Sequence, residues 1–180
     1  MKKLLLIIVV IVVGLGYFAL RNGTNEAVPG EPVVNDGFRP DPSNAIFIFD
    51  EGPITLKEGR REVEVAPGSA MKEETLLTDF VGYGDLNNDG KNDAVAILVQ
   101  SGGASGVFIY LAGYVSGPVT YKGTNAIFLG DRVTPKSISI NDGAITVNYL
   151  DRKEGEPFAA EPTVSVTRNF QYQGGTLIEK

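Results

Sequence analysis

The stretch that decides the fold reads Gly84-Asp85-Leu86-Asn87-Asn88-Asp89-Gly90-Lys91-Asn92-Asp93, followed directly by Ala94-Val95-Ala96-Ile97-Leu98-Val99. Counted from Asp85, Asp or Asn side chains occupy positions 1, 3, 5 and 9, and glycine occupies position 6. Calcium-binding loops have this spacing, because side chains at positions 1, 3 and 5 and the carbonyl of position 7 turn towards one centre, while glycine permits the sharp turn. The expected ligands of a Ca²⁺ ion are Asp85, Asn87, Asp89, the main-chain carbonyl of Lys91, and Asp93.

The loop does not follow the EF-hand pattern. An EF-hand needs a bidentate glutamate at position 12, which is Ala96 here, inside the apolar run. Asp93 at position 9 must therefore close the site, and the chain continues as a strand. The motif D-x-[DN]-x-D-G-x-x-D resembles the loops of FG-GAP, VCBS and dockerin-type repeats, and this resemblance implies that the matching positions bind calcium. It departs at Asn88, where those loops often carry glycine, and a single copy excludes a whole propeller.

A second interpretation of the loop is structural. A polar turn rich in Asn, Asp and Gly can lead into a strand without binding a metal ion. Three carboxylates within nine residues repel one another when no cation is present, which favours the calcium interpretation.

Composition limits the classes of function. The chain has 180 residues, of which 43% are hydrophobic, which fits one globular domain with extensions. It contains no histidine and no cysteine, so disulfides, His- or Cys-based metal sites and the usual Ser-His-Asp and Cys-His catalytic arrangements are excluded. The net charge of −6 makes nucleic acid a poor partner, and none is expected.

The N-terminus predicts a membrane anchor. Lys2 and Lys3 precede the uncharged segment Leu4–Leu20, which as a helix would span ~25 Å, the short end of the transmembrane range. The lysines place the N-terminus in the cytoplasm and the remaining chain outside it, as a single-pass protein of the cell membrane. The alternative is a cleaved signal peptide, which would make the protein secreted, although no convincing A-x-A site follows.

Three regions follow from this pattern. Residues 1–20 form the anchor or signal peptide, and residues 21–43 form a linker rich in proline and glycine that has no periodicity and cannot build a core. Residues 44–180 form the extracytoplasmic β domain with its one calcium loop.

The domain reads as all-β. Turns recur at short spacing without a strong amphipathic helix, which predicts an antiparallel sandwich or small barrel of about nine or ten strands after the transmembrane helix. Residues 94–100 are apolar on both faces and should be central in the sheet. Asn141-Asp142-Gly143 predicts a hairpin turn. Residues 71–80 suit a helix or a strand, and the neighbouring strands favour a strand.

The order of these elements across most of residues 44–180 also resembles that of a group of small uncharacterised bacterial envelope proteins. The motifs that carry this resemblance are the calcium loop, a Gly-Gly hairpin, Leu-Gly-Asp-Arg, an Asn-Asp-Gly hairpin, Glu-Pro-Thr and a C-terminal Gly-Gly hairpin. The resemblance implies an exported β domain and brings no known activity.

No catalytic residue is predicted, and the chain is not expected to be an enzyme. Asp131, Asp151 and Glu161 are the candidates for acid and base, but a turn and solvated loops explain them more simply. Arg132 should form a local salt bridge with Asp131 or contact a carbonyl group, and Arg152 should be solvated. The tyrosines that could face a ligand also suit core or surface packing, and they are Tyr83, Tyr110, Tyr114, Tyr121 and Tyr149.

Three functions remain open. The first is a membrane-anchored, extracytoplasmic calcium-binding domain with a structural or interaction role. The second is an envelope polymer-binding protein or hydrolase with calcium as a scaffold, which predicts a concave patch with paired carboxylates or aligned tyrosines away from the loop. The third is an inert spacer whose loop binds nothing. The sequence does not identify an envelope protein or glycan as the partner.

Overall fold

The computed structural model describes residues 37–102 and 104–180, which contain eleven strands and one 3-10 helix, η1 (Pro42–Asn44). The predicted all-β fold is confirmed for these residues. The predicted membrane segment Leu4–Leu20 lies outside them, as does most of the linker. Among the residues described, no helix has the length and apolar character needed to cross a membrane.

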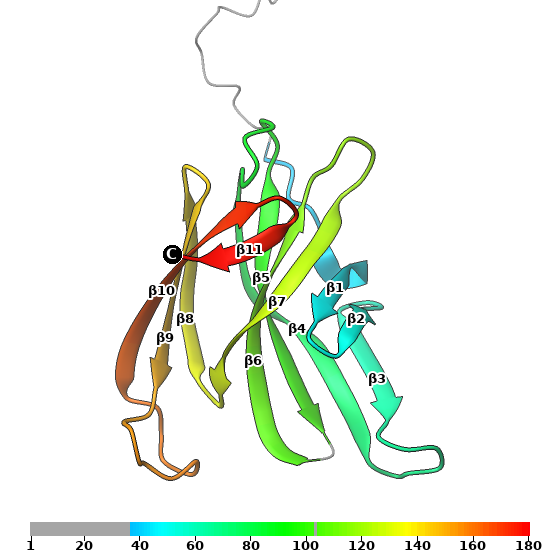
Figure 1. Ribbon diagram of the computed structural model, residues 1–180, viewed down its shortest axis with the longest axis vertical. Helices are drawn as coiled ribbons and strands as arrows, with labels where there is room; N and C mark the ends of the chain where they lie inside the picture. The colour runs from blue at the N-terminus through cyan, green and yellow to red at the C-terminus, as the bar shows by residue number, and fades with distance from the viewer. Residues whose placement is uncertain (1–36, 103) are drawn as a thin grey trace, which may run out of the picture. The chain divides into compact units, whose positions relative to one another are not determined.

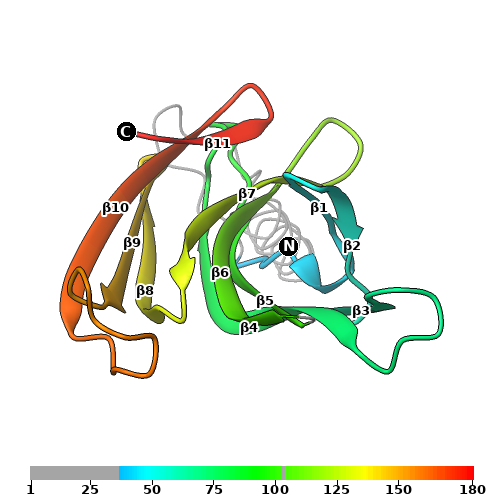
Figure 2. The same ribbon diagram turned by 60° about the horizontal axis from the view of Figure 1, so that its bottom comes forward.

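Seven strands form the first sheet, in the order β2-β1-β7-β6-β5-β4-β3. They are β1 (Ile46–Phe49), β2 (Gly52–Thr55), β3 (Arg60–Glu64), β4 (Lys72–Gly84), β5 (Asp93–Gly102), β6 (Ala104–Val115) and β7 (Lys122–Asp131). The sheet curls until its two edges, β2 and β3, approach each other, so that it is nearly closed (Figure 2).

One strand pair differs from the antiparallel arrangement predicted. β1 runs parallel to β7, where Ile48 is the partner of Asn125. No hairpin links these two strands, so their direction is set by packing alone. Gly123 allows the close approach, because a Cβ atom there would lie 2.0 Å from the main-chain oxygen of Ile46.

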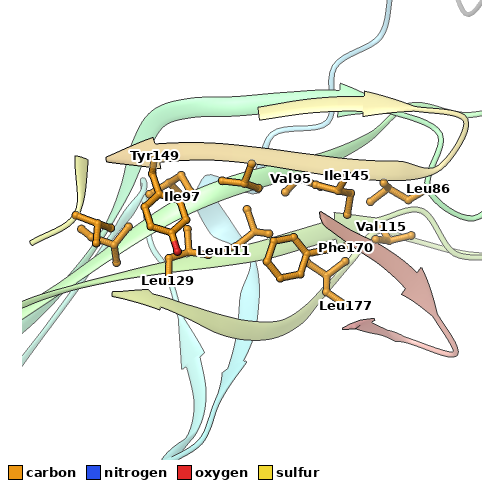
Figure 3. Close-up of a cluster of buried hydrophobic side chains, with 13 residues drawn as sticks. Leu86, Val95, Ile97, Leu111, Val115, Leu129, Ile145, Tyr149, Phe170 and Leu177 are labelled. Atoms are coloured by element: carbon orange, nitrogen blue, oxygen red, sulfur yellow. The ribbon is translucent and has the colours of Figure 1, made fainter. Parts of the chain in front are cut away.

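Four strands form the second sheet, in the order β11-β10-β9-β8. They are β8 (Thr134–Asn141), β9 (Ala144–Asp151), β10 (Val164–Gln173) and β11 (Thr176–Glu179). This sheet packs against the outer side of the curled sheet (Figures 1 and 2). The main core fills the space between the two sheets, with Phe170 and Leu177 on one side and Leu111 on the other (Figure 3).

Strand β5 lies in the interior of the first sheet, with β6 on one side and β4 on the other, as the apolar run predicted. Val95 and Ile97 are fully buried in the core shared with the second sheet. Leu98 points the other way, into a smaller core with Phe47 on the inner side of the curl. Burying one such side chain stabilises the fold by about 1.5–3 kcal/mol, so both faces of β5 must be apolar.

Two further predictions are confirmed. Residues 71–80 fall largely within β4, which is a strand. Asn141 pairs with Ala144 across the predicted hairpin, where Asp142 (φ 49°) and Gly143 (φ 73°) both adopt the left-handed conformation that a tight two-residue turn requires.

Candidate metal centre

The predicted calcium loop connects β4 to β5, because β4 ends at Gly84 and β5 begins at Asp93. It lies at the same end of the strands as the loop between β6 and β7 (Figure 1). Asp85, Asn87, Asp89 and Lys91 lie in this connection, Asp93 is the first residue of β5, and the β6–β7 loop is their neighbour.

Asp85 organises the first half of the loop. Its Oδ1 atom accepts hydrogen bonds from the backbone N–H groups of Asn87 and Asp89, both at 3.2 Å. Its Oδ2 atom accepts one from the N–H of Gly90 at 2.8 Å. One carboxylate thus gathers three amides, which holds the chain in a tight turn around it.

Ser116, in the β6–β7 loop, contacts three of the four predicted ligand side chains. The Asn87 amide donates to the Ser116 carbonyl at 2.9 Å, and the Ser116 hydroxyl donates to Asp89 Oδ2 at 2.5 Å. The Ser116 N–H donates to Asp93 Oδ1 at 2.8 Å. Ser116 is itself buried, so the structure brings these side chains together around a fixed point.

Asp93 is completely buried. Its second oxygen accepts a hydrogen bond from the Leu86 N–H at 2.8 Å, so each oxygen has one amide donor. No lysine or arginine within residues 37–102 and 104–180 forms an ion pair with it. Burial raises the pKa of Asp93, and the negative charge of Asp89 acts in the same direction. This carboxylate is thus held inside the protein without a compensating positive charge.

Asp89 has a different environment. Its Oδ1 atom accepts a hydrogen bond from the Lys91 N–H at 2.9 Å, and the Lys91 ammonium lies 3.8 Å from Oδ2. Burial acts to raise the pKa of Asp89, but the hydrogen bonds from Ser116 and Lys91 outweigh it, and the pKa lies below its ordinary value. Asp89 is therefore ionised at neutral pH.

The donor set has the chemistry that Ca²⁺ prefers, since it consists of carboxylate, amide and carbonyl oxygens. The Lys91 carbonyl accepts no hydrogen bond from the residues described, which leaves it able to coordinate. The acidic side chains are nevertheless not assembled into a ring. In the part of the chain described, no three Asp or Glu side chains gather closely enough to hold an ion as they stand. The residues fit the ion in type and loop position, and the carboxylates of Asp85, Asp89 and Asp93 would have to come closer together to hold it.

Two residues that stabilise the loop are missing from the sequence-based prediction. One is Ser116, and the other is Tyr121, whose hydroxyl donates to the Asn92 carbonyl at 2.9 Å. Neither belongs to a motif. Their position follows from the pairing of Ala94 with Tyr114, which sets the β6–β7 loop beside the start of β5. Only the register in which β5 pairs with β6 could have placed these two residues beside the loop.

The three candidate catalytic carboxylates lie in different surroundings. Asp131 accepts a hydrogen bond from Val107 N–H and pairs with Arg132 at 3.0 Å, as predicted for that arginine. Asp151 accepts from the Arg152 N–H, and Glu161 is exposed.

Arg152, which was predicted to be solvated, is instead a structural residue. Its guanidinium donates to the carbonyls of Asp131, Arg132 and Ala160 at 3.1, 3.2 and 2.8 Å. It thereby links the β7–β8 turn to the β9–β10 connection.

Comparisons of this chain with protein-family models, with curated protein sequences and with solved structures found no match.

Asn88 provides a test of the loop conformation. Its φ of 59° lies in the left-handed region, which glycine and asparagine adopt more readily than other residues. We expect Asn88→Gly to leave the free energy of unfolding nearly unchanged and Asn88→Val to lower it by about 1–2 kcal/mol. Urea denaturation of both variants measures this, and equal stability of the two would contradict the left-handed assignment.

Proposed function

We propose that the loop from Asp85 to Asp93 binds Ca²⁺, and that the protein is a membrane-anchored extracytoplasmic domain in which this ion has a structural or interaction role. The main support is Asp93, which is fully buried, has no cationic partner among the residues described, and lies beside the ionised Asp89. A divalent cation would offset both charges. The predicted anchor Leu4–Leu20 supports the location.

The proposed role follows from what the loop touches. Asp85, Asn87, Asp89, the Lys91 carbonyl and Asp93 would supply the oxygens. Because Ser116 already contacts Asn87, Asp89 and Asp93, ordering these side chains also orders the β6–β7 loop. The ion would thus join two connections at one end of the first sheet, where they form a surface available to a partner.

Calcium should raise the melting temperature of the protein. For the full chain in nonionic detergent, a tenfold excess of Ca²⁺ over its dissociation constant stabilises by about 1.4 kcal/mol, which corresponds to about 5 °C. Circular dichroism melts with Ca²⁺ and with chelator measure the shift. Asp89→Ala should remove the shift, because it deletes one carboxylate ligand.

Glu154→Ala is the matched control, because Glu154 is an exposed acidic residue outside the loop. It should leave the calcium-dependent shift intact. Mg²⁺ at the same concentration should give a smaller shift, because it demands a tighter octahedral geometry. Identical melting curves with Ca²⁺ and with chelator would rule the proposal out.

A second candidate function is supported by a separate feature. An envelope-binding protein was predicted to have a concave patch with carboxylates or tyrosines away from the loop. A pocket with Asp50, Glu51 and Tyr110 in its lining supports this candidate. Binding of a partner through this pocket is therefore proposed alongside calcium binding, with calcium as the scaffold.

A further inference from the structure

A pocket of about 530 Å³ opens on the inner side of the curled first sheet. It lies where β5 ends and β6 begins, the end that comes forward in Figure 2. Gln100 in its lining is seven residues along β5 from Asp93, a separation of about 23 Å at the rise of a strand. The pocket is therefore remote from the calcium loop. Its volume is within the range of small-ligand sites.

One wall of the pocket is aromatic. Phe108, Tyr110 and Phe128 all line it. The ring centroids of Tyr110 and Phe128 are 5.5 Å apart, and those of Phe108 and Phe128 are 6.2 Å apart. Phe49 supports Tyr110 from behind at 4.9 Å. Phe128 is 49% exposed although it is a large apolar residue, so this wall presents ring surface that the fold does not cover.

Acidic side chains also line the pocket. Asp50 and Glu51, in the β1–β2 turn, are exposed and have no hydrogen-bond or ion-pair partner for their side chains within residues 37–102 and 104–180. Glu73 also lines the pocket, but Arg61 pairs with it at 3.1 Å. Three carboxylates against one guanidinium leave two negative charges uncompensated.

The negative field extends to the aromatic wall. Burial, and then the carboxylates of Glu51 and Asp50, raise the pKa of the Tyr110 hydroxyl. Tyr110 donates to the Gln100 side chain, and Gln100 donates to Glu73, both at a long 3.4 Å. These long contacts leave the polar groups free to rearrange around a ligand.

Thr75, which does not itself line the pocket, has an unsatisfied polar atom in the neighbouring part of the sheet. Thr75 pairs with Arg61 on one side and with Gln100 on the other, so the three side chains share one face of the sheet. Thr75 is fully buried, and its hydroxyl is the one buried side-chain polar atom without a hydrogen-bond partner in the part of the chain described. Leaving such a group unpaired costs about 1–3 kcal/mol, which a fold rarely tolerates without a use for it.

We propose that this pocket binds an organic cation, an alkylammonium or guanidinium group, with its charge facing Asp50 and Glu51 and its apolar body against Tyr110 and Phe128. Aromatic faces attract cations, and the two uncompensated carboxylates add to that attraction. The inference rests on the second candidate function and names its ligand class. Because the loop is at the other end of β5, the pocket residues can be tested while the loop is free of calcium.

The test compares two probes of nearly the same shape, choline and uncharged 3,3-dimethyl-1-butanol. Isothermal titration calorimetry on the full chain in nonionic detergent, with chelator present, should show choline binding about tenfold more tightly. Nα-acetyl-lysine amide and Nα-acetyl-arginine amide, with Nα-acetyl-norleucine amide as the neutral control, show whether a polypeptide side chain is the better source of the cation.

Two variants locate the binding. Asp50→Asn/Glu51→Gln and Phe128→Ala should each weaken choline binding about tenfold. All three residues are exposed, so the fold should be retained, which circular dichroism checks. The control Glu154→Gln/Glu161→Gln removes the same charge from another exposed loop and should bind as the parent does.

Equal affinity for choline and its neutral isostere would overturn the proposal, as would binding of a neutral oligosaccharide alone. Loss of choline binding in the control double variant would also overturn it, because that would show an effect of net charge. Calcium binding is measured separately, so failure of either proposal leaves the other standing.

Discussion

Asp93→Ala is expected to lower the free energy of unfolding by about 2–5 kcal/mol, measured by urea denaturation in the presence of chelator. The carboxylate is completely buried, and it is the acceptor for the N–H groups of Leu86 and Ser116, each at 2.8 Å. Alanine would leave both amides without a partner. Since one amide lies in the β4–β5 loop and the other follows β6, the substitution should loosen both connections together.

Asp85→Ala is the control that separates the effect of burial from the effect of losing hydrogen bonds. Asp85 accepts three backbone hydrogen bonds, but it is only half-buried, so water can replace it and the expected loss is about 1 kcal/mol. Asp93→Asn keeps one acceptor oxygen, so its loss of unfolding free energy should lie between those of Asp85→Ala and Asp93→Ala. If Asp93→Ala and Asp85→Ala lower the free energy of unfolding equally in the presence of chelator, then the burial of Asp93 does not add to the stability of the protein.

Periodicity and local turn chemistry were sufficient to predict the elements near the site. The apolar run from Ala94 to Val99 predicted a strand covered on both faces, which is the position of β5. Asn141-Asp142-Gly143 predicted its hairpin because two left-handed residues in succession need Asp or Asn and Gly. These signals are local, since each depends on residues within a few positions of one another.

Features that depend on distant pairing could not be predicted in this way. The convergence of Ser116 on the loop requires the register of β5 with β6. The parallel pairing of β1 with β7 and the three carbonyl contacts of Arg152 join segments that no sequence pattern connects. The acidic and aromatic pocket also depends on distant residues, because Pro53 of β2 and Arg61 of β3, on the two edges of the sheet, line it together only when the sheet curls.

The division of the strands between two sheets depends on close contact at β4. β4 crosses β8, and glycines replace side chains where they meet: a Cβ atom at Gly82 would lie 2.8 Å from Ile138 Cγ2, and one at Gly84 would lie 2.7 Å from Ile140 Cγ2. Gly84 directly precedes the loop, so this contact also sets where the loop begins. Glycine at these two positions allows the two sheets to approach closely, and a larger residue would push them apart.

Gly82→Ala is therefore expected to destabilise the protein by about 1–3 kcal/mol through overpacking. The clash is with one methyl group, because the Ile138 Cβ atom would be 3.3 Å away. In an Ile138→Ala background that methyl group is absent, and Gly82→Ala should cost clearly less. Urea denaturation of the two single variants and the double variant gives a coupling energy, expected at 0.5 kcal/mol or above. Strictly additive losses would mean that the Ile138 side chain does not set the cost of Gly82→Ala, and that the second sheet is positioned by other contacts.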